Sequence, residues 1–136
     1  MKKIDKKLYC FQYDVTNNAV FKQGYTPRET ENNYEVIFDE ETDDHAYIDK
    51  EKVAEEYVDG DIINGRKILY VYTFNENVNH AMELFEKEFA ETIAEEERKL
   101  RNIKQVHSIL LEKQAEILAK YPNGVKENET YGERCN

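Results

Sequence analysis

Apolar or amphipathic side chains recur at steps of three, four and seven residues between Val78 and Tyr121, a segment without glycine or proline. They form one stripe, made of Val78, Met82, Phe85, Phe89, Ile93, Leu100, Ile103, His107, Leu110, Ile117 and Tyr121. Strong helix formers such as Glu, Lys, Ala and Leu lie between them. The pattern therefore predicts a helix over 78–121, which at 1.5 Å per residue would be roughly 66 Å long.

This helix is too long for the core that its own chain can build. A compact domain of 136 residues has a radius of gyration near roughly 14 Å. Either the helix bends in the polar run Ala94–Lys99, or its outer half packs on another chain. We favour the second arrangement, because the alternation continues to Tyr121 like the seam of a helix–helix contact. The predicted homo-oligomer interface consists of Leu100, Ile103, His107, Leu110 and Ile117.

Alternating patterns before the helix predict strands. Leu8–Val15 carries Tyr9, Phe11, Tyr13 and Val15 on one face, which predicts a strand with one buried face. An asparagine-containing turn at 16–19 and a second strand over Val20–Tyr25 complete a hairpin, which Pro27 ends. After a polar connector over Arg28–Asn33, Tyr34–Phe38 forms the third strand.

The middle of the chain predicts a loop, a short helix and a second hairpin. Asp39–His45 is the densest acidic run, and Ile48–Val58 has helical spacing with Asp49 near the N-cap. Asn64-Gly65 favours a type I′ hairpin whose second arm runs from Arg66 to Phe74. That arm is apolar on both faces, with Ile68, Tyr70, Tyr72 and Phe74 on one of them, so we expect it to lie centrally in the sheet.

A capping box at Thr73–Glu76 is expected to open the long helix directly from this strand. Pro122 and Gly124 are expected to end the helix, and 125–136 forms a polar tail. The predicted fold class is α+β. An N-terminal antiparallel sheet of four to five strands packs on a long C-terminal helix that extends into an oligomer interface. Residues 1–124 form the single domain.

Composition limits the partners of this chain. It carries 29 Asp and Glu against 19 Lys and Arg, for a net charge of −10. Such a surface repels nucleic acid and anionic membranes and attracts basic proteins. No apolar run is long enough to cross a membrane. Cys10 and Cys135 lie near opposite ends, which favours two free thiols in a reducing compartment. We therefore expect a cytoplasmic protein, made by a bacterium or by a virus that infects one.

The sequence offers little catalytic material. Ser108, the single serine, lies inside the long helix, and phosphate-binding glycine patterns are absent. His80 with Glu83 could form half of a metal site, but a solvated histidine at a helix start is the simpler interpretation. Asp39–Asp44 lacks the glycine and the final glutamate of a calcium loop. We expect no enzyme, no metal and no cofactor.

Arginine is scarce, and its placement suggests a binding site. Arg98 and Arg101 lie one turn apart on the long helix, and Arg28 lies on the connector after the first hairpin. Guanidinium groups suit bidentate phosphate contacts and stacking on bases. Aromatic residues such as Phe85 and amides such as Asn79 near the helix start could hold a base. For each residue alone, the simpler interpretation is favoured: Arg98 and Arg101 pair with nearby carboxylates, and Phe85 belongs to the core.

The chain resembles small phage proteins from low-GC Gram-positive hosts. The resemblance rests on the tyrosine-rich hairpin, NNYEVIF at 32–38, YIDKEKV at 47–53, and ILYVYTF at 68–74 before a long helix. It is most similar to the phage anti-Thoeris sponges, which sequester cyclic ADP-ribose signals made by bacterial TIR proteins. This resemblance implies an oligomer without catalytic groups. By residue chemistry and placement, its ligand-binding residues would be Arg28, Asn79, Phe85, Arg98 and Arg101.

The sequence therefore predicts a phage-encoded anti-defence protein in the host cytoplasm. It would bind a small cyclic nucleotide immune signal without turnover and would not bind nucleic acid directly. The net charge of −10 is in tension with a phosphate ligand. An alternative is an acidic nucleic-acid mimic that inhibits a host nuclease or CRISPR effector by protein–protein contact. Its partner would be a basic host defence protein, bound by the Asp39–Asp44 loop and the acidic face of the long helix. A third alternative is a structural coiled-coil protein without a ligand.

Overall fold

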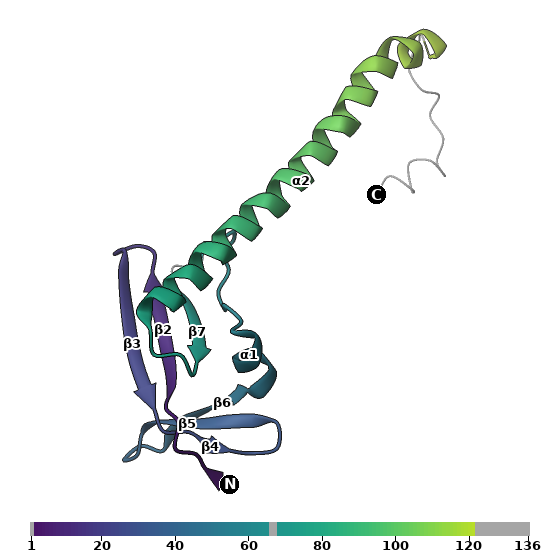
Figure 1. The fold of residues 1–136 in the computed structure, drawn as a ribbon. Coiled ribbons are helices and arrows are strands. Elements are labelled where there is room, and N and C mark those ends of the chain that lie inside the picture. Colours follow the sequence, from purple (N-terminus) through teal and green to yellow (C-terminus); the bar gives the residue numbers. More distant parts are fainter. Residues whose placement is uncertain (1, 66–67, 122–136) are drawn as a thin grey trace. The chain divides into compact units, whose positions relative to one another are not determined.

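A computed structural model describes residues 2–65 and 68–121 of the chain. The fold is α+β, as the sequence predicts: antiparallel strands precede the long helix α2 (Val78–Lys120) (Figure 1). The chain divides into two units, 1–92 and 93–136, which are described separately. Arg66, Pro122, Gly124, Cys135 and the predicted tail over 125–136 lie outside the described residues.

A three-stranded antiparallel sheet has the order β3-β2-β7, so β2 is the central strand and β7 lies at an edge, not centrally as its two apolar faces predicted. Its strands are β2 (Leu8–Asp14), β3 (Ala19–Tyr25) and β7 (Ile68–Thr73). The first hairpin is confirmed, because Leu8 pairs with Tyr25 and Asp14 pairs with Ala19. Asn18 in its turn has a left-handed φ of 49°, a conformation that asparagine tolerates better than most residues.

The remaining strands form a second sheet with the order β1-β4-β5-β6. They are β1 (Lys2–Lys3), β4 (Arg28–Glu29), β5 (Asn33–Asp39) and β6 (Asp44–Asp49). The sequence pattern predicts one sheet of four to five strands. Two sheets form instead, because the chain leaves β3 after Tyr25 and passes the buried Pro27, which has no N–H to donate.

Three local predictions need correction in this second sheet. The connector over Arg28–Asn33 contains β4, and the predicted loop over Asp39–His45 contains the first residues of β6. Ile48 belongs to β6, so the short helix α1 (Lys50–Glu55) begins after it. Asp49 is the N-cap as predicted, because its Oδ1 accepts the Glu51 N–H at 2.7 Å. The acidic residues of this region hide the strand alternation in the sequence.

Strand β2 is buried on both faces, whereas its alternation predicted one buried face. Phe11 is fully buried in a cluster with Leu69, Val71 and Phe85. Leu8, from the opposite face, is fully buried in a second cluster with Val36 and Val53. The second face is covered because β5 and α1 supply apolar side chains from distant parts of the sequence.

The predicted two-residue hairpin at Asn64-Gly65 is wrong. A type I′ turn needs positive φ at both central residues, and of the two only Gly65 has it, with φ 80°. Asp61 Oδ1 accepts the N–H groups of Ile63 and Asn64 at 3.0 and 3.2 Å, which holds a local turn. The antiparallel contact before β7 is an isolated bridge from Asp59 to Tyr70.

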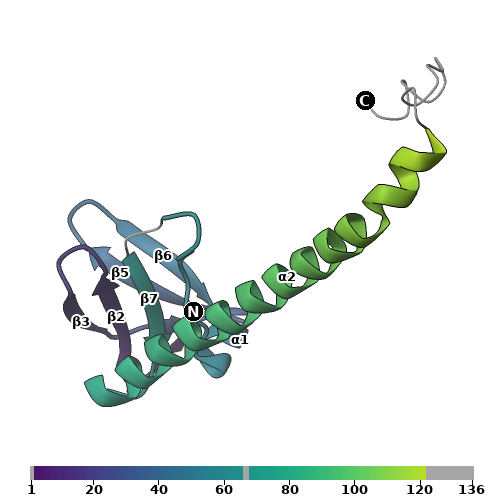
Figure 2. The same ribbon diagram turned by 90° about the horizontal axis from the view of Figure 1, so that it is seen from above.

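Helix α2 begins one turn later than the predicted capping box implies. Asn77 Oδ1 accepts the Asn79 N–H at 2.9 Å, and the Asn77 carbonyl accepts the Ala81 N–H at 3.3 Å. Asn77 therefore caps the helix in place of Thr73. In the first unit, Ala81 and Phe85 pack on β2 and β7 (Figures 1 and 2).

In the second unit, residues 93–120 are helical, without interruption at Ala94–Lys99. Large apolar side chains there are exposed, Ile103 by 65% and Val106 by 67%. The residues of the predicted oligomer interface share this exposure: Leu100, Ile103, His107, Leu110 and Ile117. Their role in an interface stays a prediction.

Replacing Phe85 with alanine should lower the free energy of unfolding by about 3–5 kcal/mol, because the change opens a cavity in the core. Urea denaturation followed by circular dichroism measures this loss. Phe21→Ala is the matched control, since the Phe21 side chain is 56% exposed and its removal should cost less than about 0.5 kcal/mol. Equal losses in the two variants would contradict the packing of α2 on the sheet.

Candidate functional site

The five predicted ligand-binding residues fall in both units: Arg28, Asn79 and Phe85 in the first, Arg98 and Arg101 in the second. Phe85 is 1% exposed, and its ring packs edge-on against Tyr13 with centroids 5.9 Å apart. This placement leaves no face for a base, so the stacking role predicted for Phe85 is wrong. Asn79 is exposed in the first turn of α2, and Arg28 Nη1 lies 4.0 Å from Glu35 Oε1 in the other sheet.

The arginines of the second unit are exposed. Arg98 donates from Nε and Nη2 to the Glu95 carboxylate at 3.1 and 2.6 Å, which confirms the simpler interpretation for this residue. The guanidinium holds the pKa of Glu95 below its usual range. Arg101 is exposed on the same helix. Ligand binding by Arg28, Asn79, Arg98 and Arg101 stays a prediction.

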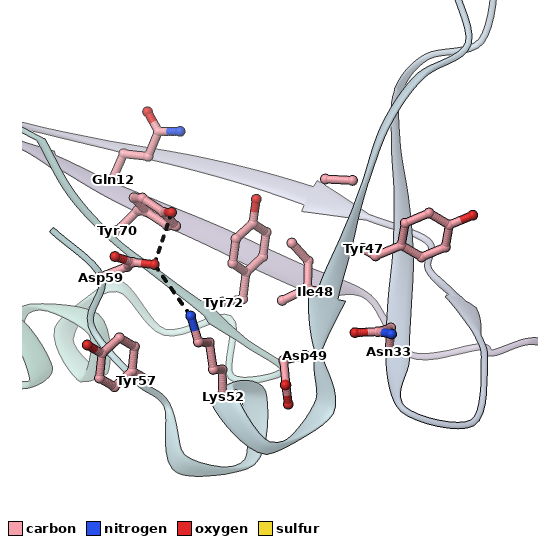
Figure 3. Close-up of a pocket in the computed structure, with 11 residues that line it drawn as sticks. Gln12, Asn33, Tyr47, Ile48, Asp49, Lys52, Tyr57, Asp59, Tyr70 and Tyr72 are labelled. Atoms are coloured by element: carbon pink, nitrogen blue, oxygen red, sulfur yellow. Dashed lines mark hydrogen bonds and ion pairs between the residues drawn. The ribbon is translucent and has the colours of Figure 1, made fainter.

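The structure instead offers a pocket of about 480 Å³ in the first unit, hereafter the tyrosine pocket. This volume lies in the range of small-molecule sites, roughly 300–1,000 Å³. Figure 3 shows side chains from β2, β5, β6, α1 and β7 around it. They are Gln12, Asn33, Ala46, Tyr47, Ile48, Asp49, Lys52, Tyr57, Asp59, Tyr70 and Tyr72.

Strand alternation builds one wall of the tyrosine pocket. Tyr70 and Tyr72 lie two residues apart on β7 and therefore project from the same face of the sheet. On the neighbouring β2, Gln12 pairs with Tyr70 and Cys10 pairs with Tyr72. The two tyrosine rings meet edge to face with centroids 6.0 Å apart. Their mutual contact fixes the orientation of both rings.

A charged cluster lies beside this wall. Tyr70 donates its hydroxyl hydrogen to Asp59 Oδ2 at 3.1 Å, and Lys52 Nζ lies 3.8 Å from the same oxygen (Figure 3). Lys52 Nζ also lies 5.3 Å from the centroid of the Tyr57 ring, within cation–π range. The Lys52 side chain is 56% exposed, so it can reorient toward a bound molecule.

The phenol of Tyr72 remains protonated at neutral pH. Burial is the largest cause that raises the pKa of Tyr72, and the nearby Cys10 adds to it. Burial also raises the pKa of the Cys10 thiol, which is 4% exposed. Tyr72 therefore presents a neutral hydroxyl group to the pocket.

A second polar cluster lies where α1, β7 and α2 meet. Thr73 donates its hydroxyl hydrogen to Glu56 Oε2 at 2.6 Å, and His80 Nε2 lies 2.6 Å from the same oxygen. In a hydrolytic triad the imidazole accepts the proton of the nucleophile. Here the carboxylate lies between hydroxyl and imidazole, so the cluster joins three elements and does not activate Thr73.

The chemistry of the tyrosine pocket suits binding of a ring-shaped ligand. Its tyrosines offer faces for stacking, and Gln12 and Asn33 offer amides for the edge of a ring. Lys52 offers one cation, while Asp49 and Asp59 can accept hydrogen bonds from hydroxyl groups. Among residues 2–65 and 68–121, no group of three or more His, Cys, Asp and Glu could hold a metal ion.

None of the helices in the described residues combines the length and apolar character required to cross a membrane. The chain matches no protein-family model, and neither the curated proteins nor the solved structures contain a match. The predicted location in the host cytoplasm therefore stays a prediction.

The tyrosine pocket was not predicted, although part of its signal is visible in the sequence. The alternation places Tyr70 and Tyr72 on one face of β7, a strand that is apolar on both faces. Asn33, Lys52 and Asp59 lie in three different segments, however, and only the pairing of β5 with β6 and of Asp59 with Tyr70 brings them together.

Replacing Tyr72 with phenylalanine should flatten the loss of stability at alkaline pH. Because burial raises the pKa of Tyr72 in the fold, its contribution to stability is complete below the unfolded pKa of about 10 and is lost as pH rises above it. Urea denaturation from about pH 8 to about pH 11 measures the slope. Tyr121→Phe removes the same hydroxyl from a 40% exposed residue and should leave the wild-type slope unchanged. If the free energy of unfolding of Tyr72→Phe fell with pH as steeply as that of the wild type, the raised pKa of Tyr72 would be contradicted.

Proposed function

We propose that this chain binds a small cyclic nucleotide of the cyclic ADP-ribose type in the tyrosine pocket and sequesters it without turnover. A phage protein with this activity would remove an immune signal of its host. The observation that carries the proposal is the composition of the pocket: several tyrosines, two amides, one lysine and two carboxylates line about 480 Å³. This set matches the parts of a nucleotide.

Each group of the pocket has a partner in such a ligand. The Tyr57 and Tyr70 rings can stack on the base, as aromatic residues do in many nucleotide sites. The Gln12 and Asn33 amides can donate to and accept from the edge of the base. Asp59 can accept from ribose hydroxyls, a role that acidic residues have in dinucleotide-binding folds.

Lys52 is the cation in the lining of the tyrosine pocket, beside the carboxylates of Asp49 and Asp59, and is the group that can contact a phosphate of the ligand. Its ammonium already lies 3.8 Å from Asp59 Oδ2, so a phosphate would compete with that carboxylate. The affinity for the ligand is highest if Lys52 contacts the phosphate while Asp59 keeps its hydrogen bond from Tyr70. Asp59 can then also accept a hydrogen bond from a ribose hydroxyl group. We therefore expect Lys52 to contribute more affinity than any other single charged residue.

The Lys52→Ala variant should bind cyclic ADP-ribose about tenfold to a hundredfold more weakly, because it loses one charge-assisted hydrogen bond. Isothermal titration calorimetry measures the dissociation constant. Lys113→Ala removes the same charge from the second unit and should bind like the wild type. Arg28→Ala and Arg101→Ala test the residues predicted from the sequence. No heat with the wild-type protein would reject the ligand class, and wild-type affinity in Lys52→Ala would reject the pocket.

The exposed hairpin between β5 and β6 favours a second candidate function. Asp39, Glu40, Glu41, Asp43 and Asp44 are all exposed there. Among the described residues, no lysine or arginine pairs with them, and the ion pair of this hairpin joins His45 to Asp43 at 3.8 Å. Such a tip could occupy the basic groove of a host nuclease or CRISPR effector.

Inhibition of such an enzyme should weaken steeply with salt, because exposed charges are screened within about 8 Å at physiological ionic strength. The double variant Asp43→Asn/Asp44→Asn should inhibit less than the wild type in a DNA-cleavage assay. Glu51→Gln/Glu55→Gln removes two exposed carboxylates from α1 and serves as the control. Equal inhibition by both double variants would contradict a role for the hairpin.

A further inference from the structure

The second unit carries an apolar stripe that is left in contact with water. Ile93, Leu100, Ile103 and Leu110 are 56%, 50%, 65% and 54% exposed. They recur at steps of seven, three and seven residues along the helix, and Glu96 and His107 occupy the intervening positions of the same stripe. In a heptad written abcdefg, Ile93, Leu100 and His107 occupy a, while Glu96, Ile103 and Leu110 occupy d. Stripes of this kind pack against a second helix.

The charges beside the stripe distinguish the two orientations of a helix pair. Glu97 and Lys104 occupy e positions, and Lys99 occupies a g position. Residues at e and g form the contacts between helices that set their orientation. Glu97 and Lys104 form no ion pair within the described residues, whereas Lys99 Nζ lies 3.3 Å from Glu96 Oε1. Both unpaired charges are therefore available to a second helix.

A parallel pair in register would bring like charges together. Each g position would face the next e position of the other helix, so Lys99 would meet the partner's Lys104 on both sides. Glu96 would meet the partner's Glu96 inside the seam. Like charges at such positions are destabilising, and a buried unpaired carboxylate is costly.

An antiparallel pair avoids both conflicts. In one register, Leu100 lies opposite the partner's Ile103. The same register places Ile93 opposite the partner's Leu110, which forms a second apolar layer. Glu96 then lies opposite the partner's His107, an acid against a hydrogen-bond donor. Because e faces e in antiparallel pairs, Glu97 lies opposite the partner's Lys104. Two-fold symmetry repeats each of these contacts.

We propose that a second copy of this chain covers the stripe, and that the two helices run antiparallel in this register. The occupant is a copy of the same chain because the stripe is self-complementary in charge and in apolar layers. This pairing goes beyond the proposed function, since it involves residues 93–110 and no ligand.

The first test is a charge reversal measured by analytical ultracentrifugation at micromolar concentration. The wild-type protein should be a dimer or a multiple of it. Glu97→Lys should raise the dissociation constant about tenfold, because two attractive pairs become repulsive, and Glu97→Lys/Lys104→Glu should restore it. Glu112→Lys makes the same charge change away from the stripe and should behave as wild type. A monomeric wild type, or a double variant as weak as the single one, would overturn the proposal.

The second test reads the orientation directly by cysteine cross-linking in a Cys135→Ser background. Mixing Leu100→Cys and Ile103→Cys proteins under mild oxidation should give a disulfide between the two different variants, because these positions share a layer. Each variant alone should cross-link poorly. Efficient disulfides within each single variant and none between them would show a parallel pair and overturn the antiparallel arrangement.

Discussion

Burial of β2 on both faces is the constraint on which the first unit depends. Its Phe11 side packs with Leu69, Val71 and Phe85, while its Leu8 side packs with Val36 and Val53. A strand buried on one face alone could form one sheet with one helix. Because both faces of β2 are apolar, α2 packs on one face, and β5 and α1 pack on the other. The tyrosine pocket continues this second face, where Gln12 and Tyr70 follow Cys10 and Tyr72 along the paired strands.

Glu56 adds a polar constraint to this apolar arrangement. It ends α1 with a left-handed backbone, φ 51° and ψ 49°, which costs a residue other than glycine about 1–2 kcal/mol. Its carboxylate accepts from Thr73 at 2.6 Å and lies 2.6 Å from His80 Nε2. These contacts tie the end of α1 to the end of β7 and the first turn of α2. The contacts of Glu56 therefore fix the backbone on which the neighbouring Lys52 and Asp59 lie, at the edge of the tyrosine pocket.

The two units present different kinds of surface. The first unit contains two buried apolar clusters and a pocket with polar side chains, which suits recognition of a small molecule. Residues 93–120 leave apolar side chains exposed along the helix, which suits association with another helix. Ligand binding and self-association would therefore use separate residues, so variants can remove one property and leave the other intact.

Local pattern determined much of this fold. The period of the apolar residues predicted α2 within one residue, and turn chemistry predicted the first hairpin and the Asp49 cap. These features depend on neighbours in sequence, which the sequence displays. Tertiary structure decided the rest: the separation into two sheets, the strand β6 and the tyrosine pocket. Each of these depends on which distant strands pair. The residues Asn33, Lys52, Asp59 and Tyr72 share no spacing, and only strand pairing and packing bring them to one cavity.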